Sequence, residues 1–121
     1  MKSPVFSGIG NVAFKYYMLF QHQSVVEETE KTEPSWTLGL KPGPFINEVS
    51  RSLFMFLGSK VALLAVDART ERTRDEVIRE DTWKKIMDRC YGELEKGKVE
   101  HLLVLLGVPI AYPRLVWLEN M

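Results

Sequence analysis

The chain has 121 residues, 45% of them hydrophobic, and its 16 basic and 16 acidic residues cancel. This length and composition predict one domain with a buried core and exclude a disordered tail, while the balanced charge argues against a broad basic face for nucleic-acid binding. The single cysteine, Cys90, excludes an internal disulfide and predicts a reducing, intracellular location, which we take to be the cytoplasm. No apolar run is long enough to predict a transmembrane segment, and peripheral membrane attachment stays open.

The first two segments predict a helix and a long connection. In residues 11–28, apolar side chains surround the helix axis instead of forming one stripe, which predicts a helix buried on most sides. Gly8, Gly10 and Asn11 provide its start. Residues 29–50 are rich in Pro, Gly, Thr and Ser. They predict a long irregular connection, of a kind that is usually functional or belongs to a larger unit.

The next segment, residues 52–66, predicts a β-hairpin. Two apolar runs, residues 52–57 and 60–66, are separated by the dipeptide Gly58-Ser59. A glycine followed by a small residue is typical of a tight two-residue turn between antiparallel strands. We therefore expect two neighbouring antiparallel strands here.

A helix and a strand complete the pattern. Apolar residues at spacings of three and four predict an amphipathic helix of about four turns, which begins at Asp81 or Thr82 and ends at Gly97. Its apolar stripe consists of Trp83, Ile86, Met87, Cys90, Tyr91 and Leu94. Residues 101–107 form a continuous apolar run, which predicts a strand covered on both faces. Strand, helix and strand together predict a right-handed parallel crossover in an α/β fold.

The crossover brings two arginine-containing segments to one edge of the sheet. Residues 67–74 and 107–114 leave two parallel strands at the same end, where open α/β sheets hold their ligands. Asp67 and Arg69 are therefore candidate catalytic residues, which would orient a metal or face a phosphate. Arg72 and Arg114 are weaker candidates for binding a phosphate-containing substrate.

These charged residues also have a structural interpretation. Asp67 and Arg69 could form a buried ion pair that closes the strand end. For Arg72 and Arg74, pairing with nearby acids such as Glu76 on a solvated turn is favoured over a functional role. Residues 112–114 are favoured as a rigid turn over a phosphate-facing loop.

The histidines and the cysteine are interpreted as structural. His22 and His101 have no ligand-like spacing, so ordinary polar histidines are favoured over metal ligands. Cys90 lies on the apolar stripe of its helix, which favours a buried, unreactive thiol over a nucleophile.

Four stretches follow one another over nearly the whole chain: SPVFSGIGNVAFKYYMLFQHQS, GPFINEVSRSLFMFLG, DARTER and HLLVLLGVPIAYPRLVWLEN. In this order they resemble the fungal branch of the PhoD-like phosphatases, within the calcineurin-like metallophosphatase superfamily. The resemblance implies a four-layer α/β/β/α sandwich with divalent or ferric metal ions at the strand ends. There the metal centre would activate a water or hydroxide against a phosphate ester substrate.

The chain departs from this family in its metal-binding motifs. Neither the upstream Asp-Asp-His-Asp type motif nor the downstream Gly-Asp-Val-His type motif occurs. We therefore expect residues 1–121 to be a partial PhoD-like phosphatase domain, inactive alone, with no assigned metal ligand and no firmly held metal. The alternative is a non-catalytic α/β binding or interaction module. In either case, uncovered apolar strand faces would favour self-association.

Overall fold

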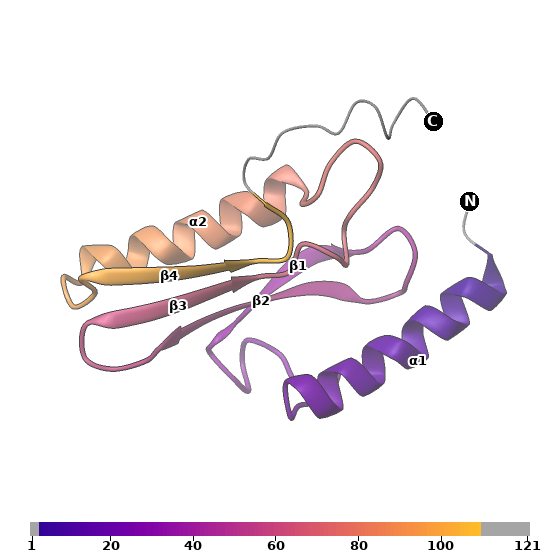
Figure 1. The fold of residues 1–121 in the computed structure, drawn as a ribbon, viewed down its shortest axis with the longest axis horizontal. Helices are drawn as coiled ribbons and strands as arrows, with labels where there is room; N and C mark the ends of the chain where they lie inside the picture. The colour runs from indigo at the N-terminus through magenta and orange to yellow at the C-terminus, as the bar shows by residue number, and fades with distance from the viewer. Residues whose placement is uncertain (1–2, 110–121) are drawn as a thin grey trace.

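The computed structural model describes residues 3–109, which form one mixed sheet and two helices (Figure 1). The elements follow in the order α1 (Pro4–Gln21), β1 (Trp36–Pro42), β2 (Val49–Phe56), β3 (Val61–Val66), α2 (Glu80–Glu95) and β4 (His101–Leu106). In the strand order β1-β2-β3-β4, β2 is antiparallel to both of its neighbours, and β3 and β4 are parallel. This arrangement confirms the predicted α/β fold, the hairpin and the parallel crossover.

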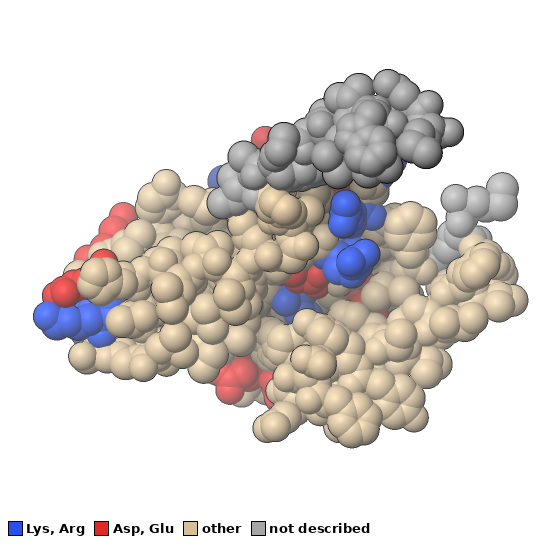
Figure 2. All heavy atoms as spheres, viewed as in Figure 1, with Lys and Arg blue, Asp and Glu red and all other residues tan. Residues whose placement is uncertain are grey.

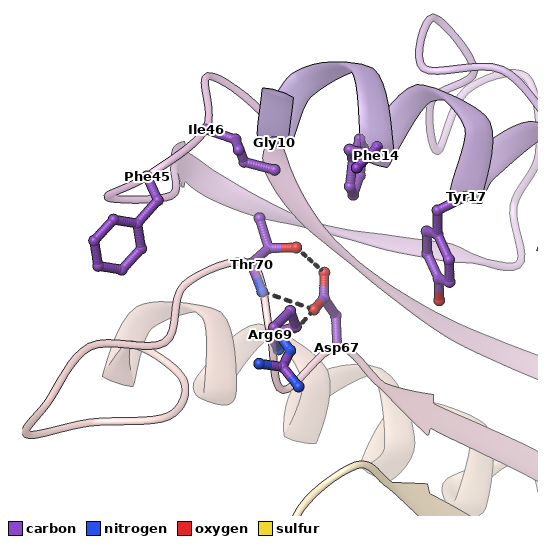
Figure 3. Close-up of a pocket in the computed structure, with 9 residues that line it drawn as sticks. Gly10, Phe14, Tyr17, Phe45, Ile46, Asp67, Arg69 and Thr70 are labelled. Atoms are coloured by element: carbon purple, nitrogen blue, oxygen red, sulfur yellow. Dashed lines mark hydrogen bonds between the residues drawn. The ribbon is translucent and has the colours of Figure 1, made fainter. Parts of the chain in front are cut away.

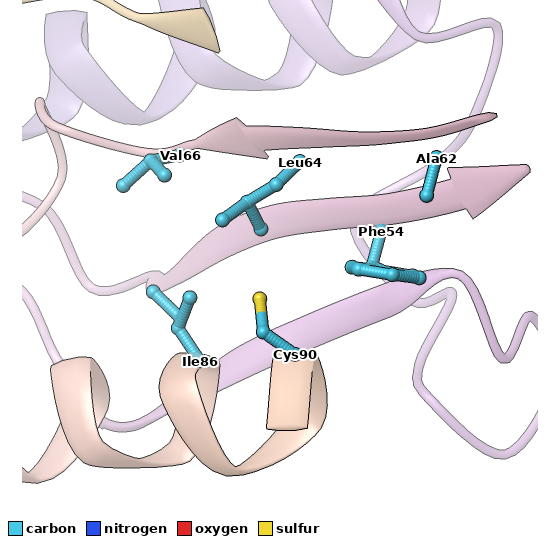
Figure 4. Packing of buried hydrophobic residues seen from close by; sticks show 6 residues of the cluster. All are labelled: Phe54, Ala62, Leu64, Val66, Ile86 and Cys90. Atoms are coloured by element: carbon cyan, nitrogen blue, oxygen red, sulfur yellow. The ribbon is translucent and has the colours of Figure 1, made fainter. Parts of the chain in front are cut away.

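The helix α2 packs on one face of the sheet. Side chains alternate along a strand, so every second residue of β3 points toward this helix. The resulting cluster consists of Phe54, Ala62, Leu64, Val66, Ile86 and Cys90 (Figure 4). Full burial of a large apolar side chain stabilises a fold by about 1.5–3 kcal/mol, so this cluster fixes α2 against the sheet.

The helix α1 covers part of the opposite face. Phe14 and Met18 of α1 pack with Trp36 of β1 in a second buried cluster, over the β1–β2 side of the sheet. On the β4 side of the sheet, Leu103 and Leu105 are 52% and 57% exposed. Part of this sheet face therefore stays uncovered within residues 3–109.

The prediction of a long irregular connection is wrong for much of residues 29–50. Residues 29–50 contain all of β1, and β2 already begins at Val49. Gly39 lies within β1, and a Cβ at this position would lie 2.6 Å from a carboxylate oxygen of Glu71. Its glycine therefore reflects a close approach between two segments distant in sequence, and the local composition does not reveal that approach.

Three predictions of burial are also wrong. The helix α1 begins at Pro4, earlier than expected, and Phe6 and Phe20 are 76% and 73% exposed, so it is not buried on most sides. In α2 the buried row is Thr82, Ile86 and Cys90, while Trp83, Tyr91 and Leu94 of the predicted stripe are exposed. The strand β4 lies at the sheet edge in the described part of the chain and is largely exposed.

The hairpin turn is one residue longer than predicted. Leu57 N donates a hydrogen bond to Val61 O at 2.9 Å, so three residues lie between the paired positions instead of two. The four-layer sandwich implied by the family resemblance stays a prediction, because the described residues contain a single sheet.

Candidate functional site

The side chain of Asp67 organises the loop that leaves β3. One carboxylate oxygen accepts hydrogen bonds from the backbone N–H groups of Arg69 and Thr70, both at 3.0 Å. The other accepts from the backbone N–H of Arg51 at 2.9 Å and from the hydroxyl of Thr70 at 2.5 Å. Ser52 in turn accepts a hydrogen bond from the Asp67 N–H at 3.1 Å. This Asx-type turn therefore binds the loop to the neighbouring strand β2.

Asp67 and Arg69 do not form the ion pair considered from the sequence. The only hydrogen bond between them in the structure uses the backbone N–H of Arg69. The Arg69 side chain is exposed, and its guanidinium has no hydrogen-bond or ion-pair partner among residues 3–109. The carboxylate thus fixes the backbone at Arg69, while the guanidinium stays unpaired within the described part of the chain.

The later arginines of the loop face solvent. Arg72 and Arg74 are exposed, and within residues 3–109 neither forms an ion pair. The local turn is held instead by Thr73, which bonds with Glu76 through backbone and hydroxyl groups. Arg114 lies outside the described residues, as do Tyr112 and Pro113.

A cavity of about 520 Å³ lies between this loop, α1 and the connection from β1 to β2. Its lining residues are Gly10, Ala13, Phe14, Tyr17, Phe45, Ile46, Asp67, Arg69 and Thr70 (Figure 3). In the space-filling view, acidic and basic side chains gather at the hollow between α1, at lower right, and the rest of the molecule (Figure 2). Sequence reasoning found the charged side of this cavity and missed its apolar side.

Tyr17 and His22 lie beside the cavity as a hydrogen-bonded pair. The Tyr17 hydroxyl and His22 Nε2 are 2.8 Å apart, and the His22 ring meets the Trp36 ring edge-on at 5.2 Å. Burial raises the pKa of Tyr17, and the negative charge of Asp67 adds to this effect. Burial lowers the pKa of His22, although Asp67 opposes the shift. Both side chains are therefore uncharged at pH 7.

Glu71 is a structural anchor that sequence reasoning missed. It is fully buried, accepts a hydrogen bond from the Thr82 hydroxyl at 2.7 Å and accepts one from the Arg79 N–H at 3.1 Å. The Arg79 guanidinium donates in turn to two backbone carbonyls at the end of β1. Glu71 thus joins the loop to the start of α2. No local signal separates it from the other acids of the loop.

The described residues do not fit a metal centre of their own. Within residues 3–109, no three or more His, Cys, Asp or Glu side chains lie close enough together to hold an ion. Asp67, the candidate nearest the strand end, already accepts two hydrogen bonds on each oxygen. Cys90 is buried and burial raises the pKa of its thiol, as expected for an unreactive residue.

Comparison with known proteins shows the family of this chain. The model of the family described as PhoD related phosphatase matches residues 1–121. The chain belongs to this family. The uncharacterized protein YGR266W of Saccharomyces cerevisiae is 42% identical over 126 residues, which cover 98% of this chain and 18% of the yeast protein. The chain thus spans about a fifth of that relative. No solved structure matches it, and none of the described helices could span a membrane.

Proposed function

We propose that this chain forms the strand-end section of a phosphoesterase domain, in which Arg69 binds a phosphate oxygen and Asp67 positions Arg69. The observation that carries the proposal is the set of hydrogen bonds on Asp67, which fixes the Arg69 backbone at the cavity while its guanidinium keeps no described partner. A planar guanidinium suits phosphate oxygens because it donates two parallel hydrogen bonds. Membership of a phosphatase family supports this assignment.

The water-activating metal ions of this reaction class are not assigned to residues 3–109, because the described side chains do not fit them. We therefore expect the isolated chain to hydrolyse an aryl phosphate no faster than background. Activity that disappears with a chelator and returns with Mn²⁺ or Fe³⁺ would contradict this expectation.

A full-length family member with arginine at the position of Arg69 tests the proposal. Replacing that arginine with alanine should lower kcat/KM for an aryl phosphate by ~10²-fold, the scale on which a positioned charged group acts. The matched control is Arg74→Ala, which removes an exposed arginine of the same loop and should change kcat/KM by less than about twofold. Unchanged turnover in a folded Arg69→Ala variant would refute the role of Arg69. A full-length protein with neither turnover nor metal after dialysis would favour the binding module.

A further inference from the structure

The cavity between α1 and the loop after β3 has a charged side and an apolar side. Asp67, Arg69 and Thr70 lie across the space from α1, whose Phe14 and Tyr17 side chains point toward it (Figure 3). Phe45 and Ile46 close a further side from the connection between β1 and β2. The volume of about 520 Å³ lies in the range of small-molecule sites, which combine mostly apolar walls with a few polar groups.

The charges at this cavity favour an anionic ligand. The carboxylate of Asp67 is covered by four hydrogen-bond donors, so its acceptor sites are occupied. Arg69 is the cationic side chain of the lining, and its guanidinium has no partner among residues 3–109. Tyr17 adds no negative charge at neutral pH, since the pKa of its phenol lies above the ordinary value of 10. A ligand with a single anionic end would therefore place that end on Arg69.

The apolar walls favour an aromatic body over a small polar one. Three of the lining residues, Phe14, Tyr17 and Phe45, present rings to the cavity or its rim. Aromatic rings attract one another in offset or edge-to-face arrangements beyond what burial alone contributes. The Phe14 and Tyr17 rings already meet in a tilted pair, with centroids 6.2 Å apart, which leaves ring edges and faces for a third ring.

We propose that the cavity binds a phosphate monoester of an aromatic alcohol, with the phosphate on Arg69 and the aromatic ring against Phe14 and Phe45. This inference rests on the proposed function and adds the class of its substrate. It assigns Phe45, an exposed residue of the β1–β2 connection, as a residue that selects substrates by their alcohol portion.

Saturation-transfer NMR on the full chain tests this inference, because it observes the ligand at low protein concentration. The probes are 1-naphthyl phosphate, inorganic phosphate and 1-naphthol, compared in competition. We expect 1-naphthyl phosphate to bind at least ~10-fold more tightly than either of the other two, since only it engages both sides of the cavity. Phe45→Ser and Arg69→Gln should each weaken its binding by at least ~5-fold, whereas the control Arg74→Gln should not change it.

The substituted residues are exposed, so their loss should not open the core; circular dichroism checks the fold of each variant. Equal affinity for 1-naphthyl phosphate and either of the other probes would overturn the inference, as would unchanged binding in the Phe45→Ser variant. Binding by this chain needs no turnover. A failure here with hydrolysis intact in a full-length family member would therefore refute the substrate class alone, and absent hydrolysis there would refute the proposed function.

Discussion

Asp67 fixes the strand-end loop because each of its carboxylate oxygens accepts two hydrogen bonds. Two of the four donors are backbone N–H groups of the loop, and one is the N–H of Arg51 in the next strand. In the proposed site, Asp67 therefore acts on a ligand indirectly, by fixing the backbone of Arg69. This explains why Arg69 is positioned at the cavity while Arg72 and Arg74, further along the same loop, face solvent.

His22 gives a pH-dependent test at the residue scale. Burial lowers its pKa below the ordinary value of 6.5. At pH values between the pKa of His22 in the folded chain and its pKa of about 6.5 in the unfolded chain, the unfolded chain binds more protons. The contribution of His22 to the free energy of unfolding is therefore fully present above about pH 6.5 and is lost as the pH falls through the folded-state pKa. We expect the His22 ring protons to titrate in NMR with a midpoint below 6.5. A midpoint at or above that value would show that the ring is not shielded from water as described.

At the scale of elements, the cavity depends on the close approach of two connections. Gly43 lies at the start of the β1–β2 connection, and a Cβ at this position would come within 2.1 Å of the Thr70 carbonyl oxygen. The backbone segments therefore meet without room for a side chain. This contact places the loop after β3 beside the connection that supplies Phe45 and Ile46 to the cavity.

Gly43→Ala should consequently destabilise the protein by about 1–3 kcal/mol, because backbone atoms must move to admit the methyl group. The matched control is Gly92→Ala in α2, where an added Cβ meets nothing within 4 Å. The control should be neutral or stabilising by up to about 1 kcal/mol, owing to the helix propensity of alanine. Urea unfolding of both variants measures the difference. Equal stability of Gly43→Ala and the unmodified chain would contradict the described contact.

The sequence predicted the elements whose signals are local. The hairpin follows from two apolar runs around Gly58. The predicted parallel crossover placed Asp67 and Arg69 just after the carboxyl end of β3. The strand β1 was missed because Gly39 and Pro42 resemble loop residues, whereas Gly39 makes room for the buried Glu71. The apolar side of the cavity comes from segments distant in sequence from the loop, so no local pattern could predict their meeting.

At the scale of the whole molecule, uncovered apolar surface predicts association. Leu103 and Leu105 of β4, which is an edge strand among residues 3–109, are more than half exposed, and α1 exposes Phe6 and Ile9. Exposed edges and contiguous apolar patches drive protein association. We expect light scattering coupled to size exclusion to find oligomers of the isolated chain, and the Leu103→Lys, Leu105→Lys double variant to shift them toward monomer. A monodisperse monomer with a cooperative thermal transition would count against this prediction.

The central claim, that Asp67 acts through Arg69, is tested most directly by a double-mutant cycle in a full-length family member that carries both residues. The measured quantity is kcat/KM for an aryl phosphate in the Asp67→Asn, Arg69→Ala and combined variants, with melting temperatures as the control for folding. Residues that act as one unit are not additive. We predict that the combined variant is within about twofold of Arg69→Ala alone. Losses that multiply in folded variants would show that the two residues act independently and would contradict the claim.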